Sequence, residues 1–390
     1  MTFAPLAGVR VVDLTSSLAG PTATAILASI GADVVKIERP GCGDEARAWG
    51  PPFWEGGSVM FFGANPGKRS VAVDLKAPEG REILLRLVDR ADAVVASLRP
   101  GAADRLGIGA ATLRARNGRL VHATVGAFGA RGPLAGEPGY DPLMQAAAGI
   151  MSITGEPERA PVRVGASLVD IGTGLWTALA VVSALFEGRG RTLDLSLYET
   201  AVALVPYQLA HVLAGGAAPR RSGTAFPLIA PYRVFATSDG ELMLAAANDR
   251  LFAALCDALE LPEVARDPRF ATNPLRVEHR EALDAALAAR LRTFRTDDAL
   301  GRLRAAGVPV SPVNDLAAVA ADEQLHATQI LQDVAGRRVV SPPLTVDGER
   351  VRYPSAPPLL GEHTREVLAE LGYTGGEIDA LAAAGVVAAR

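Results

Sequence analysis

The sequence predicts an α/β protein in which both ends of the chain form a doubly wound, mainly parallel sheet and a smaller α+β domain is inserted between them. Three observations support this fold class. The chain has 390 residues, more than one hydrophobic core usually accommodates. Short apolar strands alternate with helices over residues 9–125. After Arg191 the pattern changes to a hairpin and consecutive helices.

The first part of the large domain is expected over residues 1–195. A β-branched run at 9–14, a helical stretch at 22–30 and a second apolar run at 33–37 form a βαβ unit. The same alternation predicts further strands and helices, at 70–74, 78–89, 93–97, 102–106 and 120–125. In such a sheet the ligand site lies at the carboxyl ends of the strands.

The next part of the chain is expected to contain a helix, a linker and the small domain. Residues 196–225 contain a helical segment, 196–213, and then a linker rich in Gly, Ala, Pro and Arg. Within the small domain, predicted over 226–314, the turn Ser238-Asp239-Gly240 separates two strand-like runs and predicts a β-hairpin. Helices are expected to follow it at 249–259, 276–293 and 296–306.

The last part, 315–390, begins as a linker and lacks an obvious core of its own. It is Pro-rich over 342–358 and contains two short amphipathic helices, at 364–371 and 377–384. We therefore expect this segment to return to the large domain or to pack on another subunit.

Composition excludes several classes of partner. Charged residues make up 21% of the chain and the net charge is −4, so no basic excess is available for nucleic acid. Cys42 and Cys256 lie far apart and the five histidines are scattered singly, which predicts neither a disulfide framework nor a metal site. We expect small-molecule partners and a cytoplasmic location without a signal peptide. The apolar run 171–186 is shorter than the roughly 20 residues of a membrane span and is predicted to be a buried core helix.

Asp170 is the most informative single residue. It follows an apolar, strand-like run and directly precedes a long apolar helix expected to begin near Ile171. Burying an unpaired carboxylate would cost several kcal/mol, so Asp170 must be solvated, capping, paired or reactive. Capping the helix through an amide hydrogen bond is the simplest of these roles. The residues alone leave a structural cap and a reactive carboxylate both open.

Cations recur where strands are expected to end. The first strand–helix turn lacks the G-x-G-x-x-G fingerprint of dinucleotide binding, and Glu38 is followed by Arg39, which suits a phosphate better than a ribose. Lys76 follows the next strand, and Arg99 and Arg105 follow the one after it. Such a distribution suits a ligand with several phosphates, such as coenzyme A, although each residue alone could be an ordinary surface charge.

Short motifs occur in a defined order along the chain: 8–14 with Ala19-Gly20-Pro21, 31–38, 68–76, Arg99-Pro100-Gly101, 138–141, Thr154-Gly155-Glu156-Pro157 and Gly361-Glu362-His363-Thr364. In this order they resemble the family III CoA transferases, also called the CaiB/BaiF type, over essentially the full length. The resemblance implies a Rossmann-like large domain and an interlocked homodimer in which each subunit is a ring threaded by its partner.

The resemblance also implies a catalytic role for Asp170. In the family this aspartate attacks the thioester of an acyl-CoA, gives a mixed anhydride and then an aspartyl-CoA thioester, and passes CoA to an incoming carboxylic acid. Tyr140 and Asp141 match the Tyr-Glu or Tyr-Asp pair that flanks the transferase site. CoA is then a substrate moiety, and no tightly bound cofactor or metal is expected.

CoA contacts are implied for residues in the loops after the strands, namely Ser17, Leu18, Ala19, Arg39, Lys76, Ser97, Leu98 and Arg105. Leu18 stands where well-studied formyl-CoA transferases have Gln, and Ser97 where they have Asn. Leucine cannot donate a hydrogen bond to an oxyanion, so backbone amides or another side chain must take that role. The Gly-rich loop of the formyl-CoA transferase small domain is not evident either, which argues against formyl or oxalyl specificity.

Two alternatives remain beside the CoA transferase. The α-methylacyl-CoA racemases resemble the same family but use a His and an Asp to move a proton, and their His falls at Tyr140. A tyrosine with a pKa of about 10 is a poor substitute, which favours acyl-CoA transfer. A catalytically silent CoA-binding protein is the third hypothesis, and the presence of both Asp170 and Tyr140 argues against it. The acyl donor and the carboxylic acid acceptor stay open.

Overall fold

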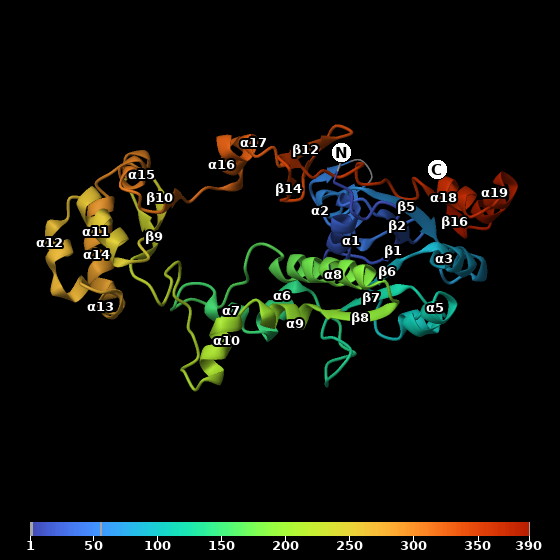
Figure 1. Cartoon of the computed structure of the whole chain (residues 1–390), viewed down its shortest axis with the longest axis horizontal. Coiled ribbons are helices and arrows are strands. Elements are labelled where there is room, and N and C mark those ends of the chain that lie inside the picture. The colour runs from blue at the N-terminus through green and yellow to red at the C-terminus, as the bar shows by residue number, and fades with distance from the viewer. Residues whose placement is uncertain (1–2, 55–56, 390) are drawn as a thin grey trace. The chain divides into compact units, whose positions relative to one another are not determined.

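The computed structural model describes residues 3–54 and 57–389, and contacts divide the chain into two compact units. The large unit comprises Met1–Ile150, Arg163–Gly216 and Gln324–Arg390, and the small unit comprises Met151–Val162 and Ala217–Glu323. Figure 1 shows the elements of both units, coloured from blue at the N-terminus to red at the C-terminus. The mixed α/β class with a mainly parallel central sheet is confirmed.

A seven-stranded sheet with the order β16-β5-β2-β1-β6-β7-β8 forms the centre of the large unit. Its strands are β1 (Arg10–Leu14), β2 (Asp33–Glu38), β5 (Lys68–Val73), β6 (Ala93–Ala96), β7 (Val121–Gly126), β8 (Arg191–Ser196) and β16 (Val387–Ala388). All neighbours pair in parallel except β16, which runs antiparallel to β5. The chain builds outward from β1 through β2 and β5, then outward on the other side through β6, β7 and β8. The strand order therefore reverses between β1 and β6, which is where doubly wound sheets bind ligands.

Strands β8 and β16 were not predicted from the sequence. β8 alternates apolar and polar residues at the sheet edge, and it pairs with β7 from Val121↔Arg191 to Gly126↔Ser196. β16 has only two residues, too few for a recognisable pattern. Its pairing with β5, at Val387↔Val73, packs the C-terminal segment onto the large unit.

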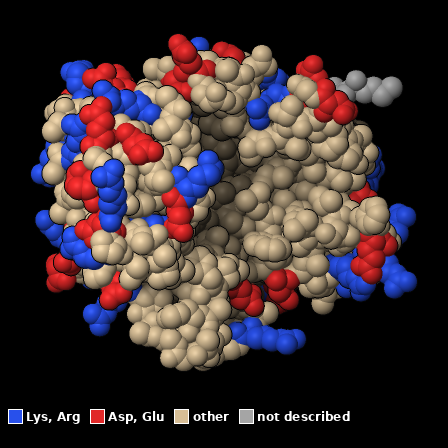
Figure 2. All heavy atoms as spheres, turned by 60° about the vertical axis from the view of Figure 1, so that its left-hand side comes forward, with Lys and Arg blue, Asp and Glu red and all other residues tan. Residues whose placement is uncertain are grey.

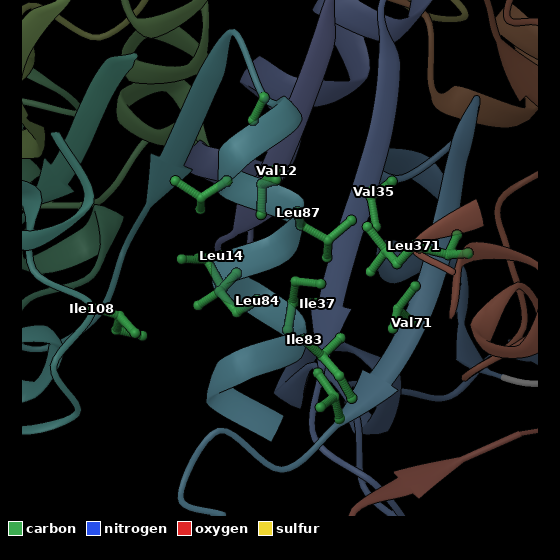
Figure 3. Packing of buried hydrophobic residues seen from close by; sticks show 14 of the residues in the cluster. Val12, Leu14, Val35, Ile37, Val71, Ile83, Leu84, Leu87, Ile108 and Leu371 are labelled. Atoms are coloured by element: carbon green, nitrogen blue, oxygen red, sulfur yellow. The ribbon is translucent and has the colours of Figure 1, made fainter. Parts of the chain in front are cut away.

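Helices pack on both faces of the sheet, and further helices lie in the connecting segments. They are α1 (Ala19–Ser29), η1 (Glu45–Ala48), α2 (Val59–Ala64), α3 (Pro78–Arg90), α4 (Ala102–Arg105), α5 (Ala110–Arg116), α6 (Asp141–Ala147), α7 (Ile150–Ile153), α8 (Leu168–Glu187), α9 (Leu197–Ala203), α10 (Pro206–Leu213), α17 (Glu323–Ala327), α18 (Thr364–Glu370) and α19 (Gly375–Ala383). One core lies between the sheet and α3, α18 and α19, and a second lies between the sheet and α1 and α8. Figure 3 shows the first core, in which side chains of the strands face those of α3: Val12, Leu14, Val35, Ile37, Val71, Ile83, Leu84 and Leu87.

Helix α8 differs from the prediction in its start, its length and its burial. It begins at Leu168 and has 20 residues, and the segment before it is irregular chain, not a strand. In the described part of the chain it is the one helix long and apolar enough to cross a membrane. One face packs on α1, whereas the opposite face leaves Leu175 at 55% and Trp176 at 54% exposed. The sequence suggested a buried core helix because α8 is apolar on all sides. An apolar pattern without a polar face does not indicate which side of the helix is buried and which is exposed.

Two helices predicted as single segments are broken. The expected helix over 196–213 is replaced by the end of β8, then α9 and α10, because Pro206 lacks the amide that a continuous helix needs. In the small unit, 276–293 divides at His279 into α13 (Asn273–Glu278) and α14 (Arg280–Leu291).

The small unit is built on an antiparallel sheet with the order β11-β10-β9. The predicted hairpin is confirmed by β9 (Tyr232–Ala236) and β10 (Glu241–Ala245), and β11 (Val310–Pro312) adds the third strand. The remaining helices are α11 (Asp249–Ala258), α12 (Pro262–Arg266), η2 (Pro268–Phe270), α13, α14, α15 (Thr296–Ala305) and α16 (Leu316–Ala321). Except for α16, which has no buried residue, these helices enclose a separate apolar core with β9 and β10.

Residues 151–162 belong to the small unit, although the sequence alone placed them in the large domain. Arg221 holds this segment, because its guanidinium donates hydrogen bonds to the carbonyl oxygens of Glu156, Pro157 and Arg159. The Gly223 amide adds a hydrogen bond to the carbonyl of Gly155.

The described residues also form three short hairpins outside these two sheets. They are β3 (Phe53–Trp54) with β4 (Gly57–Ser58), β12 (Leu331–Val334) with β13 (Arg337–Val340), and β14 (Thr345–Val346) with β15 (Glu349–Arg350). Figure 2 shows acidic and basic side chains interspersed over the charged parts of one face, as the balanced composition predicts.

Candidate active site

A cleft of about 700 Å³ lies in the large unit at the carboxyl ends of the parallel strands. The loops after β1, β2, β5, β6 and β7 line it, together with the start of α9 after β8. Ser16 and Ser97, from the loops after β1 and β6, are joined across the switch point by a hydrogen bond of 3.0 Å from the Ser16 amide to the Ser97 hydroxyl. The cleft therefore lies where the alternation of strands and helices predicted a ligand site.

Most residues singled out from the sequence line this cleft: Ser17, Ala19, Arg39, Lys76, Ser97, Leu98, Arg105, Tyr140 and Asp170. Leu18 and Asp141 do not line it. Leu18 occupies the N-cap position of α1, and Asp141 is only 3% exposed. The structure thus brings the candidate nucleophile and the candidate CoA contacts together around one space.

Asp170 is the third residue of α8, so the capping role considered from the sequence is wrong. The helix starts at Leu168, three residues earlier than a cap at Asp170 would require, and Ser167 occupies the N-cap position. The Asp170 carboxylate lies half-buried in the cleft. Burial, together with the nearby Asp141 carboxylate, raises the pKa of Asp170 to about 7. Such a shift is typical of carboxylates at functional sites.

Asp141 supplies the cap that α8 lacks. Its Oδ2 accepts hydrogen bonds from the Val169 amide at 2.7 Å and the Asp170 amide at 3.2 Å, while its Oδ1 accepts one from Gln145 Nε2 at 2.6 Å. A buried carboxylate satisfied in this way fixes the first turn of α8. The sequence did not indicate this contact because Asp141 lies 28 residues before Val169 and on another helix.

The first turn of α1 faces the same cleft. Ala19 and Gly20 line it, and no side chain caps this helix. In the described part of the chain, neither amide has a hydrogen-bond partner. Free amides at a helix N-terminus attract negative charge, so they suit an oxyanion.

Gly174 allows α1 and α8 to approach closely. A Cβ at this position would lie 2.9 Å from the Ala19 carbonyl oxygen and 2.9 Å from Thr22 Cβ. Asp170 lies one helical turn before Gly174 and therefore on the same side of α8. This crossing brings the first turn of α8, with Asp170, to the first turn of α1.

A buried ionic network supports the loop after β1. Lys68 Nζ lies 3.0 Å from Asp13 Oδ2 and also donates to the Pro21 carbonyl, while Lys36 Nζ donates to the Thr15 carbonyl at 2.8 Å. Burial of Asp13 opposes its ionisation, but Lys36 and Lys68 outweigh it and hold the pKa of the carboxyl well below its usual range. Lys68 therefore has a structural role.

Glu38 at the end of β2 is also structural. Its carboxylate accepts two hydrogen bonds of 2.7 Å from Arg47, one of 2.6 Å from the Ser70 hydroxyl and one of 2.9 Å from the Asp44 amide. No acceptor position remains for a ribose hydroxyl, which removes the dinucleotide alternative at this residue. The sequence did not identify Arg47 as the partner of Glu38, because the two residues meet only when the chain turns back over residues 39–44.

Four cations line the cleft: Arg39, Lys76, Arg99 and Arg105. None of them forms an ion pair within the residues that the structure describes. Unpaired cations from three neighbouring loops at one sheet edge match the requirements of a ligand with several phosphates. Arg69, in contrast, is held by Asp33, Glu366 and Glu370.

Tyr140 lies at the N-cap position of α6 and is 51% exposed. Its hydroxyl is 3.4 Å from Glu45 Oε1, and its ring meets the edge of Trp49 at a centroid distance of 6.4 Å. Among the described residues, no histidine lines the cleft, and no cluster of His, Cys, Asp and Glu could hold a metal ion.

The fold and the cleft define an α/β protein with its ligand site at the switch point of a doubly wound sheet and a perturbed carboxylate within it. The chain belongs to CoA-transferase family III, whose model matches residues 6–364. The predicted resemblance is therefore confirmed.

Characterised relatives extend over nearly the whole chain. A succinate–glutarate CoA-transferase of Agrobacterium fabrum is 37% identical over 382 residues, covering 94% of this chain and 96% of the relative. The succinyl-CoA:glutarate CoA-transferase of Mus musculus is 36% identical and covers 98% of this chain and 90% of its own. A crystal structure of a CaiB/BaiF family protein from Brucella suis is similar with a TM-score of 0.87 at 39% identity, over 95% of this chain and 100% of that one.

Proposed function

We propose that the protein is a CoA-transferase that moves CoA from a dicarboxylic acyl-CoA, such as succinyl-CoA, to a short dicarboxylic acid, such as glutarate, with Asp170 as the nucleophile. The observation that carries this proposal is the half-buried Asp170 carboxylate in a cleft lined by unpaired cations. A carboxylate with a raised pKa is a stronger nucleophile than an exposed one when ionised, and a pKa of about 7 leaves much of it ionised near neutral pH.

The reaction proceeds by exchange at acyl carbons. An Asp170 oxygen attacks the thioester carbon of the donor, the C–S bond breaks, and a mixed anhydride and CoA thiolate form. The thiolate attacks the Asp170 acyl carbon of the anhydride, which releases the donor acid and leaves an Asp170–CoA thioester. The acceptor carboxylate then attacks this thioester, and the thiolate released attacks the acceptor acyl carbon to give the new acyl-CoA and free Asp170.

Each attack creates an oxyanion that requires hydrogen-bond donors. Leu18 offers none in its side chain, so we assign this role to the amides of Ala19 and Gly20 at the free end of α1. The close crossing of α1 and α8 at Gly174 supports this assignment.

The cations of the cleft support CoA as the carried group. We assign the phosphate contacts to Arg39, Lys76, Arg99 and Arg105, which line the cleft, and further CoA contacts to Ser17, Leu18, Ala19, Ser97 and Leu98 from the two loops at the switch point. Leu18 belongs here as part of the turn, since it does not itself line the cleft.

The proposed acceptor class comes from the relatives. Those of Agrobacterium fabrum and Mus musculus are named for succinate or succinyl-CoA and glutarate, and an Acetobacter aceti relative, 39% identical over 350 residues, is named for acetyl-CoA and oxalate. Their common feature is a dicarboxylic acid.

Racemisation of 2-methylacyl-CoA esters finds less support. It requires a group that exchanges protons near neutral pH on each side of the α-carbon. No histidine of the described chain lines the cleft, and the hydroxyl of Tyr140 faces the Glu45 carboxylate.

We further propose a homodimer, interlocked as in the family, located in the cytoplasm. The apolar face of α8 continues into α9 and α10, where Leu204, Tyr207 and Leu213 are exposed. Leu213 is 79% and Phe186 of α8 is 94% exposed, which is unusual for large apolar side chains on a monomer surface. A partner subunit would cover this face.

The test is intact-protein mass spectrometry after incubation with succinyl-CoA in heavy water, with and without glutarate. A CoA adduct that glutarate removes as glutaryl-CoA, and that Asp170→Ala abolishes, is the expected result. A parallel incubation with a 2-methylacyl-CoA tests the alternative, because deuterium uptake into that ester without any adduct would indicate a racemase. If neither the adduct nor glutaryl-CoA forms, the proposal is refuted.

A further inference from the structure

The turn between β1 and α1 adopts an unusual backbone conformation at Ser17. Its φ is +69°, in the left-handed region that residues other than glycine seldom occupy. Ser17 lies two residues before Ala19, the first residue of α1, which lines the cleft and whose amide has no hydrogen-bond partner among the described residues. The conformation of this turn therefore sets the direction of the free amides of α1.

Two carboxylates after β2 hold Ser17. Asp44 Oδ1 accepts its amide at 3.0 Å, and Glu45 Oε1 accepts its hydroxyl at 2.6 Å. Asp44 is buried, pairs with Lys36 at 2.9 Å and caps η1, so structural roles are enough to explain why a carboxylate stands at this position. Glu45 is exposed at the cleft and forms no ion pair within the described chain. Its contact with Ser17 therefore requires another explanation.

The same oxygen of Glu45 also faces Tyr140. The distance from Tyr140 Oη to Glu45 Oε1 is 3.4 Å, longer than a strong hydroxyl hydrogen bond. Tyr140 directly precedes Asp141, whose carboxylate caps the helix that carries Asp170. Glu45 thus connects the turn before α1 with the segment that fixes the start of α8.

Glu45 has no proton to move in the proposed reaction. Each step exchanges one anion, carboxylate or thiolate, for another at an acyl carbon, so no general base is required. A second carboxylate beside the incoming acid would also repel it if it stood free. Hydrogen bonds from Ser17 and Tyr140 give this carboxylate a structural use at the cleft.

We propose that Glu45 is a positioning residue that holds the Ser17 turn and the Tyr140 hydroxyl, so that the α1 amides and Asp170 face the same acyl carbon. This inference rests on the proposed function. It adds a residue that does not contact the reacting atoms and that acts through hydrogen bonds rather than through its charge.

Steady-state kinetics of the full-length protein provide the first measurement, with succinyl-CoA and glutarate as substrates. Glu45→Ala and Ser17→Ala are each expected to lower kcat by about tenfold or more and to change the KM for succinyl-CoA by less than about threefold. The variant with both changes should be no slower than the slower single variant, because the two changes remove the same hydrogen bond between Ser17 and Glu45. Glu45→Gln should stay within about threefold of wild type, since its amide oxygen still accepts from Ser17. Glu349→Ala, an exposed glutamate on β15, is the matched control.

Hydrogen exchange of the peptide covering residues 14–25, measured without substrate, provides a second readout that does not depend on the reaction. Glu45→Ala should accelerate exchange there, and Glu45→Gln should leave it unchanged. If wild type transfers no CoA, the proposed function fails while this exchange comparison still decides the role of Glu45. Unchanged exchange in Glu45→Ala would overturn the inference whatever the activity, and so would unchanged kcat in an active enzyme. Equal loss in Glu45→Gln and Glu45→Ala would overturn it too, because charge would then be the cause.

Discussion

Replacing Asp170 by Asn is expected to stabilise the folded protein at high pH. The pKa of Asp170 is about 7 in the folded protein, against a usual value of 3.8, so the folded state binds the Asp170 proton more tightly than the unfolded chain does. The native protein therefore loses stability as the pH rises from about 4 through about 7, and the loss is complete about one unit above the folded pKa. Asn carries the shape of the neutral carboxyl at every pH and avoids this loss.

The magnitude follows from the two pKa values. The interval between 3.8 and about 7 corresponds to about 4 kcal/mol at most. Because the Asp170 carboxylate is only half-buried, solvent screening reduces this figure, and we expect about 2 kcal/mol. At pH 5 the advantage of Asp170→Asn should be about a third of its value at pH 8.5.

Urea unfolding monitored by tryptophan fluorescence tests this expectation. Trp49, Trp54 and Trp176 are the three tryptophans of the sequence, and all lie in the large unit, so the signal reports the unit that contains Asp170. Wild type and Asp170→Asn are compared from pH 5 to pH 9 at one protein concentration, with Asp194→Asn, an exposed position on β8 of the same unit, as the control. An Asp170→Asn protein that is no more stable than wild type at pH 8.5, or whose advantage does not change with pH, would refute the reasoning.

Three further predictions concern the pH profile, the helix crossing and the buried pair. The kcat/KM of the transfer reaction should rise with pH around an apparent pKa of about 7, and a flat profile between pH 6 and pH 8 would contradict this prediction. Asp141→Asn should lower the apparent pKa, because it removes a negative charge near Asp170. Gly174→Ala should destabilise the large unit by about 1–3 kcal/mol in the same urea assay and lower kcat, since its Cβ would lie 2.9 Å from the Ala19 carbonyl oxygen. Gly63→Ala on α2 is the control and should cost nothing, because open space surrounds that position. Equal effects of the two changes would exclude the close helix crossing as the cause. Arg47→Ala leaves Glu38 buried without its cation and should lower the free energy of unfolding by about 3–5 kcal/mol. Arg116→Ala breaks only the surface pair with Asp89 and should lower it by about 0–1 kcal/mol. Urea midpoints that fall equally for both variants would contradict the role of burial.

Much of the site could be predicted because parallel α/β sheets bring the ends of their strands to one edge. The residues after β2, β5 and β6 follow recognisable apolar runs, so Arg39, Lys76, Arg99 and Arg105 were expected near one another, and the structure places all four around the cleft. Local pattern is enough for such predictions, since strand direction and the βαβ connection leave few alternatives.

Side-chain partners could not be predicted in the same way. Asp141 was proposed as a member of the site, yet its carboxylate caps α8 from another helix, while Asp170, which the sequence suggested as a cap, lies inside the first turn. Glu45 was not recognised at all, because its significance depends on Ser17 and Tyr140, 28 and 95 residues away.

The sequence by itself determined the alternation of strands and helices, the sheet edge that carries the site, the hairpin of the small unit and the family. These properties depend on the period of apolar residues and on short ordered motifs, both of which are local. Only the tertiary structure decided which face of α8 is covered, that β8 and β16 complete the sheet, and that Asp141 and burial together raise the pKa of Asp170. The reason is that burial and hydrogen-bond partners are properties of residues brought together in space, and a carboxylate has no perturbed pKa until the folded chain removes water and supplies a neighbouring charge.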